Sequence, residues 1–184
     1  MSDWRQQSKL FDDAPYSYEY ATLFDLIALA RGKEQALIVA LDHITDVGNF
    51  GAVVRSAEVV GATGIVIPKK RSVAVNDAVY RTSAGAIDYL KVAREPNLVE
   101  SLKRLKDEGF WVGGAHQEAA QDIWASPLEG RLVVVLGAED NGLSRLVRET
   151  CDFEFKLPQR GFTQSLNVAQ AATAIMYEWL RRCS

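Results

Sequence analysis

The sequence predicts an α/β domain in which a mostly parallel sheet is covered by helices on both faces. Short apolar runs rich in valine and isoleucine recur along the chain, and helical patterns separate them. The length of 184 residues, with 48% hydrophobic and 24% charged residues, fits one domain with one core. The apolar runs are far too short to span a bilayer, so we expect a cytoplasmic protein without a membrane partner.

The predicted elements alternate along the chain. A polar lead-in containing Pro15 precedes a helical pattern at 21–31, which stops at Gly32. We therefore expect a helical N-terminal extension over residues 1–35 and the main domain over 36–184. Buried strands are expected at 36–41, 64–67, 110–112, 132–136 and 153–157. Further helices are expected at 50–60, 98–107, 143–149 and 165–182.

Charge and cysteine content exclude several function classes. Twenty-one basic against 24 acidic residues give a net charge of −3, so any nucleic-acid binding must be local. Cys151 and Cys183 form no Cys-x-x-Cys pair and have no histidine cluster nearby. This argues against a zinc site or a disulfide framework, and we expect no metal.

Ligands of such sheets bind beyond the carboxyl ends of the strands, which directs attention to three loops. The first loop follows the strand at 36–41 and leads into a helix. Asn49 can be its N-cap and Arg55 a surface residue. Alternatively, both side chains project near the carboxyl end of the strand, where an amide and a guanidinium can grip a phosphate or a ribose hydroxyl.

The second loop follows the strand at 132–136 and places Gly137 and Glu139 directly after it. Glycine lets backbone amides approach a ligand closely. Glu139 can instead be an acidic residue that interacts favourably with the dipole at the start of the next helix. The chain has no P-loop and no Gly-x-Gly-x-x-Gly motif, which argues against ATP hydrolysis and standard dinucleotide binding.

The third loop runs from Leu157 to the last helix. Ser165 is a reasonable N-cap, whereas Asn167 is unusual so early in a helix and its amide suits recognition. The helix behind them carries an apolar stripe that is either core or interface. Its members are Leu166, Ala169, Ala172, Ile175, Met176, Trp179 and Leu180.

Together, the three loops resemble the SpoU (TrmH-type) RNA 2′-O-ribose methyltransferases of the SPOUT superfamily. The resemblance covers about 36–182 and rests on NFGAVVR at 49–55, LGAEDNGL at 136–143 and SLNV at 165–168. RSV at 71–73 and SAGA at 83–86 also look like the family. The chain departs from it at Gln159, where methionine is frequent, and at Ala169, where serine is common.

The resemblance implies methyl transfer from S-adenosylmethionine to a ribose 2′-hydroxyl, a C-terminal trefoil knot, and a homodimer with the site at the subunit interface, for which the apolar last helix is suited. It implies that four residues lie against the cofactor, namely Leu136, Gly137, Leu157 and Leu166. It also implies that five residues match functional positions, namely Asn49, Arg55, Glu139, Ser165 and Asn167.

Arg55 is the family's candidate for activating the ribose hydroxyl. An arginine stays protonated in proteins, so we hypothesise that Arg55 fixes the adjacent phosphate and stabilises the developing alkoxide, while the proton leaves to phosphate or water. This assigns it to RNA positioning and charge stabilisation rather than to cofactor binding.

RNA recognition is expected on the domain itself, because residues 1–35 are too few for the separate N-terminal RNA-binding domain of many family members. Residues 69–106 contain nine basic and four acidic residues, a local excess of +5. Lys69, Lys70, Arg71 and Arg81 are the candidate phosphate contacts. Lys103 to Lys106 fit a solvated helical face better.

Two other function classes remain open at this point. One is a non-catalytic RNA-binding or assembly factor that keeps the knotted fold, and the other is a nucleotide-binding α/β enzyme of unrelated chemistry. The motifs do not decide between transfer RNA and ribosomal RNA.

Overall fold

A six-stranded, fully parallel sheet forms the centre of the molecule. The computed structural model describes residues 16–138, 142–163 and 165–184. The strands are β1 (Ala36–Asp42), β2 (Gly64–Pro68), β3 (Val92–Glu95), β4 (Trp111–Ala115), β5 (Arg131–Gly137) and β6 (Phe153–Phe155). They lie in the order β3-β2-β1-β5-β4-β6, and every neighbouring pair is parallel.

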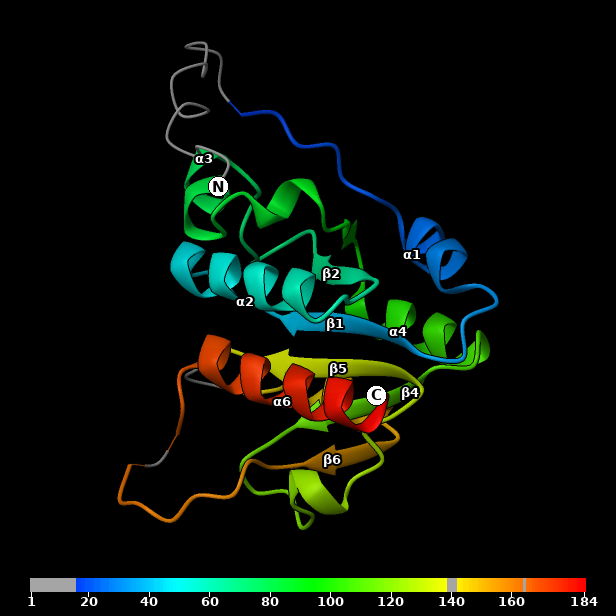
Figure 1. The fold of residues 1–184 in the computed structure, drawn as a ribbon, viewed down its shortest axis with the longest axis vertical. Helices are drawn as coiled ribbons and strands as arrows, with labels where there is room; N and C mark the ends of the chain where they lie inside the picture. Colours follow the sequence, from blue (N-terminus) through cyan, green and yellow to red (C-terminus); the bar gives the residue numbers. More distant parts are fainter. Residues whose placement is uncertain (1–15, 139–141, 164) are drawn as a thin grey trace.

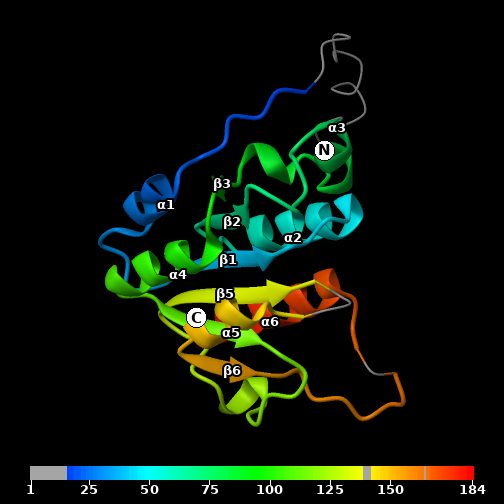
Figure 2. The same cartoon turned by 180° about the vertical axis from the view of Figure 1, so that it is seen from behind.

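Helices cover both faces of the sheet. The helices are α1 (Leu23–Ala30), α2 (Val47–Val59), α3 (Asp77–Thr82), α4 (Leu98–Asp107), α5 (Arg145–Thr150) and α6 (Val168–Arg182), with short 3-10 helices η2 (Ala86–Asp88) and η3 (Ile123–Ala125). α2 and α6 lie side by side on the face seen in Figure 1, and α1, α4 and α5 cover the other face, seen in Figure 2. The predicted parallel sheet with helices on both faces is confirmed.

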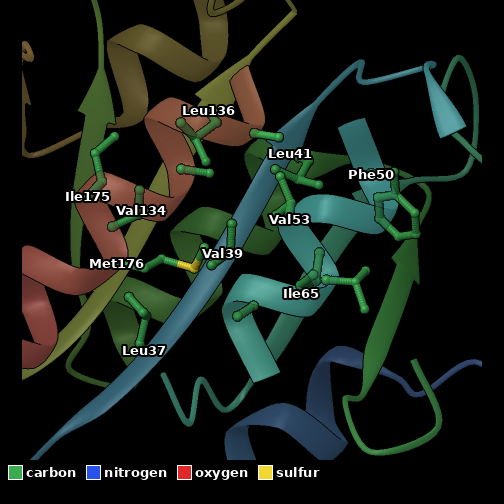
Figure 3. Close-up of a cluster of buried hydrophobic side chains, with 14 of the residues drawn as sticks. Leu37, Val39, Leu41, Phe50, Val53, Ile65, Val134, Leu136, Ile175 and Met176 are labelled. Atoms are coloured by element: carbon green, nitrogen blue, oxygen red, sulfur yellow. The ribbon is translucent and has the colours of Figure 1, made fainter. Parts of the chain in front are cut away.

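Strand alternation divides the core into two layers. Leu37, Val39 and Leu41 of β1 point towards α2 and α6, and Ile38 and Ala40 point towards the opposite helices. Figure 3 shows the first layer, in which residues of β1, β2 and β5 pack against both helices. All seven residues of β1 are buried, as expected for the strands of a sheet covered on both faces.

Two elements are absent from the sequence prediction. β3 contains only Val92 and Ala93 as apolar residues and lies at the sheet edge, so no apolar run marks it. α3 has six residues and is capped by Asn76, whose side chain accepts from the amides of Ala78 and Val79. Short elements such as these carry too little periodicity to be recognised.

The predicted caps of two helices are wrong by a few residues. α2 begins at Val47, and its N-cap is Asp46, whose carboxylate accepts from the amide of Asn49 at 2.7 Å. α6 begins after Asn167, which is the N-cap in place of Ser165 and accepts from the amide of Ala169 at 2.9 Å. In each helix a neighbouring polar side chain supplies the oxygen that the first turn requires.

Most of the apolar stripe of the last helix belongs to the core of the single chain, whereas its member Leu166 is 48% exposed. Ile175, Met176 and Trp179 are at most 5% exposed, and Ala172 is fully buried. These residues are therefore core rather than interface, and the homodimer itself stays a prediction. α1 is also part of the core, because Leu26 and Ile27 are buried against the sheet. The boundary between an extension and a main domain at residue 35 stays a prediction.

Candidate active site

A cavity of about 540 Å³ lies at the carboxyl edge of β4, β5 and β6, and we call it the carboxyl-edge cavity. Parallel strands bring their carboxyl ends to one edge, so loops distant in sequence meet there. The four residues predicted to contact a cofactor all line it, together with Ser165. They are Leu136, Gly137, Leu157 and Leu166. Val168 and Ile175 of α6 contribute an apolar wall.

Gly137 occupies a point where the backbone crosses itself closely. Ala138 and Gly142 form an antiparallel bridge, and the amide of Gly142 donates to the carbonyl of Ala138 at 2.8 Å. A Cβ on Gly137 would lie 2.1 Å from the carbonyl carbon of Gly142 and 2.4 Å from the amide nitrogen of Leu143. Backbone atoms cannot yield as a side chain can, so a substitution here displaces the returning chain as well as narrowing the cavity.

Asn49 and Asn167 meet although 118 residues separate them. The Nδ2 of Asn167 donates to the Oδ1 of Asn49 at 2.8 Å, while the Oδ1 of Asn167 caps α6. A second polar contact joins the same helices, since the Ser56 and Thr173 hydroxyls lie 2.7 Å apart. The two asparagines thus fix the start of α6 relative to α2, next to the loop that carries Ser165 and Leu166.

Glu139 lies outside the described residues, so its predicted role stays a prediction. Ser165 is exposed at the cavity rim. Gln159, one of the two departures from the family pattern, also lines the cavity. Ala169, the other, is 7% exposed in α6 and belongs to the core.

Arg55 does not line the carboxyl-edge cavity. α2 leads away from the carboxyl end of β1, and six residues, about 9 Å of helix, separate Arg55 from Asn49. Arg55 lines a second cavity of about 340 Å³ between α2, α3 and η2, which we call the Arg55 cavity. The expectation that Asn49 and Arg55 lie together at the strand end is wrong for one chain, because the helix carries Arg55 away.

The predicted phosphate contacts are all exposed. Lys69, Lys70 and Arg71 follow β2 directly, and Arg81 lies on α3. The loop after β2 is fixed by backbone contacts, since the amide of Lys69 donates to the carbonyl of Glu95 at 2.7 Å. The arrangement presents cations on the same edge of the sheet as the carboxyl-edge cavity, two strands from β5.

The basic residues of α4 differ from that group, because two of them form ion pairs. Lys103 pairs with Glu100 at 2.9 Å, and Lys106 pairs with Asp152 at 2.7 Å. α4 also lies on the face away from α2 and α6. This agrees with the interpretation of Lys103 to Lys106 as a solvated helical face.

Sequence reasoning missed Asp42 as a site residue. Asp42 ends β1, is 1% exposed and pairs in register with Gly137. Its Oδ2 accepts from the amide of Ser144 at 2.7 Å, and its Oδ1 accepts from His43 Nδ1 at 2.5 Å. The buried carboxylate therefore ties the chain that returns after β5 to β1. A charged residue at the end of an otherwise apolar strand was the signal for it.

The far wall of the carboxyl-edge cavity was also missed. It consists of His116, Gln117 and Glu118, which follow β4. The amide of His116 donates to the carbonyl of Phe155 at 2.9 Å, and its Nδ1 accepts from the amide of Glu118 at 3.3 Å. The strand prediction ended at Val112 because the glycine pair 113–114 interrupts the apolar run. A Cβ on Gly113 would lie 2.5 Å from the Phe153 ring, which explains that glycine.

None of the described helices has the length and apolarity that crossing a membrane requires. Within 16–138, 142–163 and 165–184, no cluster of three or more histidine, cysteine, aspartate or glutamate side chains is placed to hold a metal ion. Cys151 and Cys183 are free thiols, and burial is the main cause that raises the pKa of Cys151 to about 12. Cys151 is therefore a protonated, packed thiol at neutral pH.

Comparisons with known proteins agree with this arrangement. Residues 36–177 match the family described as the SpoU rRNA Methylase family. A relative from Bacillus subtilis (strain 168), provisionally named the TrmH family tRNA/rRNA methyltransferase YacO, is 43% identical over 167 residues, which are 90% of this chain and 67% of that protein.

Solved structures give the same result for the fold. The SpoU methyltransferase AviRb from Streptomyces viridochromogenes, in complex with AdoMet, is 27% identical with a TM-score of 0.75, covering 85% of this chain and 64% of that one. The AdoMet-bound rRNA methyltransferase from Sinorhizobium meliloti is 26% identical with a TM-score of 0.80, covering 90% of this chain and 62% of that one. The chain spans roughly two thirds of the length of these relatives.

Proposed function

Because the chain belongs to the SpoU rRNA methylase family, we propose that it transfers a methyl group from S-adenosylmethionine to a ribose 2′-hydroxyl of transfer or ribosomal RNA. The observation that carries this proposal is the convergence of all four predicted cofactor residues on one cavity. They come from two strand ends and a helix start, namely Leu136, Gly137, Leu157 and Leu166.

The carboxyl-edge cavity suits this cofactor by size and by chemistry. Its volume of about 540 Å³ lies within the range of small-molecule sites. Leu136, Leu166 and Ile175 offer apolar surface for an adenine ring, and the strand ends offer backbone amides and carbonyls. Gly137 is half-buried and has no side chain, so a ligand can approach its backbone closely. When bound, the cofactor supplies an electrophilic sulfonium methyl group.

The protein's own part is to position the ribose and to manage charge. Orientation of the hydroxyl relative to the methyl group supplies much of the reduction in the barrier. Arg55 holds the neighbouring phosphate and stabilises the developing alkoxide, since a guanidinium stays protonated and cannot accept the proton. Asn49 and Asn167 keep the start of α6 in place beside the cavity. Ser165 and Glu139 are further candidates for contact with the ribose.

The separation of Arg55 from the carboxyl-edge cavity supports a homodimer in which each copy completes the site of the other. Neighbouring α2 and α6 leave an apolar surface uncovered, with Val59 59% exposed and Tyr177 48% exposed. We place the interface there rather than on the buried stripe of α6. The trefoil knot expected from the family belongs to this proposal, in the chain that returns after β5.

RNA is expected to approach along the carboxyl edge, guided by Lys69, Lys70, Arg71 and Arg81. These four side chains supply local positive charge although the net charge of the whole chain is −3. Weakening of RNA binding with rising salt would reflect these contacts.

The test is transfer of a radiolabelled methyl group from S-adenosylmethionine to total RNA from a strain that lacks this gene. A 2′-O-methyl group protects the adjacent phosphodiester from alkali, so label recovered in alkali-resistant dinucleotides supports the proposal. Binding of RNA without any transfer would instead indicate a non-catalytic RNA-binding factor. If alkali releases the label only in mononucleotides, the methyl group is on a base and the enzyme is a base methylase.

A further inference from the structure

The Arg55 cavity contains two opposite charges that remain without partners among the described residues. Arg55 and Glu58 both line it and lie three residues apart on α2. Within the described part of the chain, neither side chain makes a hydrogen bond or an ion pair. A donor fork and an acceptor thus face the same space.

An exposed aromatic ring borders the same cavity. Tyr89 follows η2 and is 82% exposed, so burial in the chain does not account for it. Neighbouring Leu90 is buried in the core and fixes the backbone that carries the ring. Arg81 is exposed next to Tyr80, which lines the cavity, and adds positive charge near this surface.

The remaining walls are rigid. Ser83 is fully buried, and the backbone turns through left-handed conformations at Ala84 and Gly85, with φ of 53° and 81°. The N-terminal segment braces the same wall, because the Tyr16 hydroxyl donates to Asp88 at 2.6 Å and its ring lies 5.1 Å from that of Tyr80. The cavity is therefore held from three sides by α2, the turn after α3 and the N-terminal segment.

We propose that the Arg55 cavity binds one unstacked base of single-stranded RNA, with Tyr89 as the stacking surface. Glu58 accepts a hydrogen bond from an N–H on the edge of that base, and Arg55 remains available to the adjoining phosphate. Single-stranded RNA is commonly recognised by splaying out a base onto an aromatic side chain, and every base offers a flat face. The inference rests on the proposed function and adds a nucleotide subsite beside the reacting ribose.

The cavity's chemistry fits this ligand better than a duplex. A duplex hides the faces of its bases, so it could use Arg55 and Arg81 but not Tyr89. The volume of about 340 Å³ is suited to one small planar group rather than to a helix. If the cavity binds a base, the protein should bind single-stranded RNA more tightly than duplex RNA. General attraction between phosphates and cations would not give this preference.

The binding test uses fluorophore-labelled oligouridylate and the full chain. Tyr89→Ala should weaken binding about tenfold, as expected for loss of one base-aromatic stack, whereas Tyr89→Phe should stay near wild type because it keeps the ring. Glu58→Gln should weaken binding to a smaller extent. Trp124→Ala is the matched control, since Trp124 is also a largely exposed aromatic, 64% exposed, but lies outside the cavity. Equal affinity of wild type and Tyr89→Ala would overturn the subsite.

A second readout separates this inference from the proposed function. Oligouridylate containing 4-thiouridine should cross-link to the peptide carrying Tyr89, and unlabelled duplex RNA should not compete well. In methyl transfer, Tyr89→Ala should raise KM for RNA and leave the Kd for S-adenosylmethionine unchanged. RNA bound at Tyr89 without methyl transfer would refute the enzyme and keep the subsite. Methyl transfer with cross-links only elsewhere would refute the subsite and keep the enzyme.

Discussion

The two cavities differ in the elements that build them and in the kind of contact they offer. The carboxyl-edge cavity is made where strands end and where α6 begins, and its wall combines small and apolar residues with the polar residues that follow β4. The Arg55 cavity is made by helices and a turn, and it presents Arg55, Glu58 and Tyr89. The first suits a small molecule held largely by backbone, and the second suits a charged and planar polymer unit.

Under the proposed function, this difference predicts that cofactor binding and RNA positioning are separable in one chain. A substitution in one cavity should change one binding constant and spare the other. Neighbouring motif positions such as Asn49 and Arg55 lie in different places, whereas Asn49 and Asn167 touch. Proximity in sequence is therefore a poor guide to shared chemistry here.

The largest expected effect follows from removing Arg55. Arg55→Ala should reduce methyl transfer by two to three orders of magnitude, because one transition-state donor is worth about 2.7–4 kcal/mol. Calorimetry should show nearly unchanged S-adenosylmethionine affinity. Arg55→Lys keeps the charge and loses the planar fork, so partial rescue is expected. Transfer at the wild-type rate by both variants would remove Arg55 from the site.

A smaller effect is expected from removing Asp42, whose carboxylate holds the chain that returns after β5 next to the carboxyl-edge cavity. Asp42→Ala leaves the amide of Ser144 without its acceptor and should lower the free energy of unfolding by about 1.5–3 kcal/mol. It should also weaken S-adenosylmethionine binding, whereas Asp152→Ala, which removes an acceptor of the Val112 amide, should affect stability alone. Cofactor affinity that is identical in both variants would contradict the role given to Asp42.

Asn167→Ala should lower stability by about 1 kcal/mol, as is typical for loss of an N-cap. The matched control is Asn97→Ala, because Asn97 is the N-cap of α4 on the other face of the sheet and its Oδ1 likewise accepts from the amide two residues later, that of Val99. Urea unfolding should give similar losses for both. Methyl transfer should fall only for Asn167→Ala. If both variants lose the same amount of activity, Asn167 acts only as the N-cap of α6.

The smallest effect concerns acid stability at Glu178, which lines neither cavity. Hydrogen bonds from Arg181, and then from Arg182, lower the pKa of Glu178 to about 2 from its ordinary 4.5. The resulting stabilisation is fully present above pH 4.5 and is lost as pH falls from about 4.5 towards 2. Melting temperatures should show that Glu178→Gln flattens the pH dependence in this window. Both cavities should keep their ligand affinities at neutral pH.

The strength of local patterns decides how far the sequence predicts this molecule. Unbroken valine and leucine runs predict β1 and β5, and the loops after them contain the motifs that carry the family resemblance. β3 escapes prediction because only Val92 and Ala93 mark it, and β4 is truncated because packing of Phe153 demands Gly113. These features depend on neighbours in space that local periodicity does not record.

The same reasoning applies to the candidate site. Leu136 lies at the carboxyl end of β5 and Leu166 directly precedes α6, so sheet topology and the start of the last helix bring them to one edge. The place of Arg55 depends on where α2 starts and how far the helix carries it, and the cap at Asp46 was not predicted. Tyr89 belongs to no motif and becomes conspicuous only through its exposure.

The most direct measurement of the central claim mixes two variants that are each inactive for a different reason. Ala171→Phe fills the carboxyl-edge cavity from α6, and Arg55→Ala leaves that cavity intact. Ala28→Phe, an exposed position on α1, controls for the added ring. Arg55→Ala should bind S-adenosylmethionine normally but not RNA. Ala171→Phe should bind RNA normally but not S-adenosylmethionine.

If two copies complete each other's site, equal amounts of Ala171→Phe and Arg55→Ala should regain about a quarter of wild-type methyl transfer after subunit exchange, because half the dimers are mixed and each mixed dimer has one complete site. Sedimentation of the mixture should report two chains per particle. If the mixture is dimeric and fully exchanged but as inactive as its components, the shared site is contradicted. Arg55 would then not complete the carboxyl-edge cavity of the other copy.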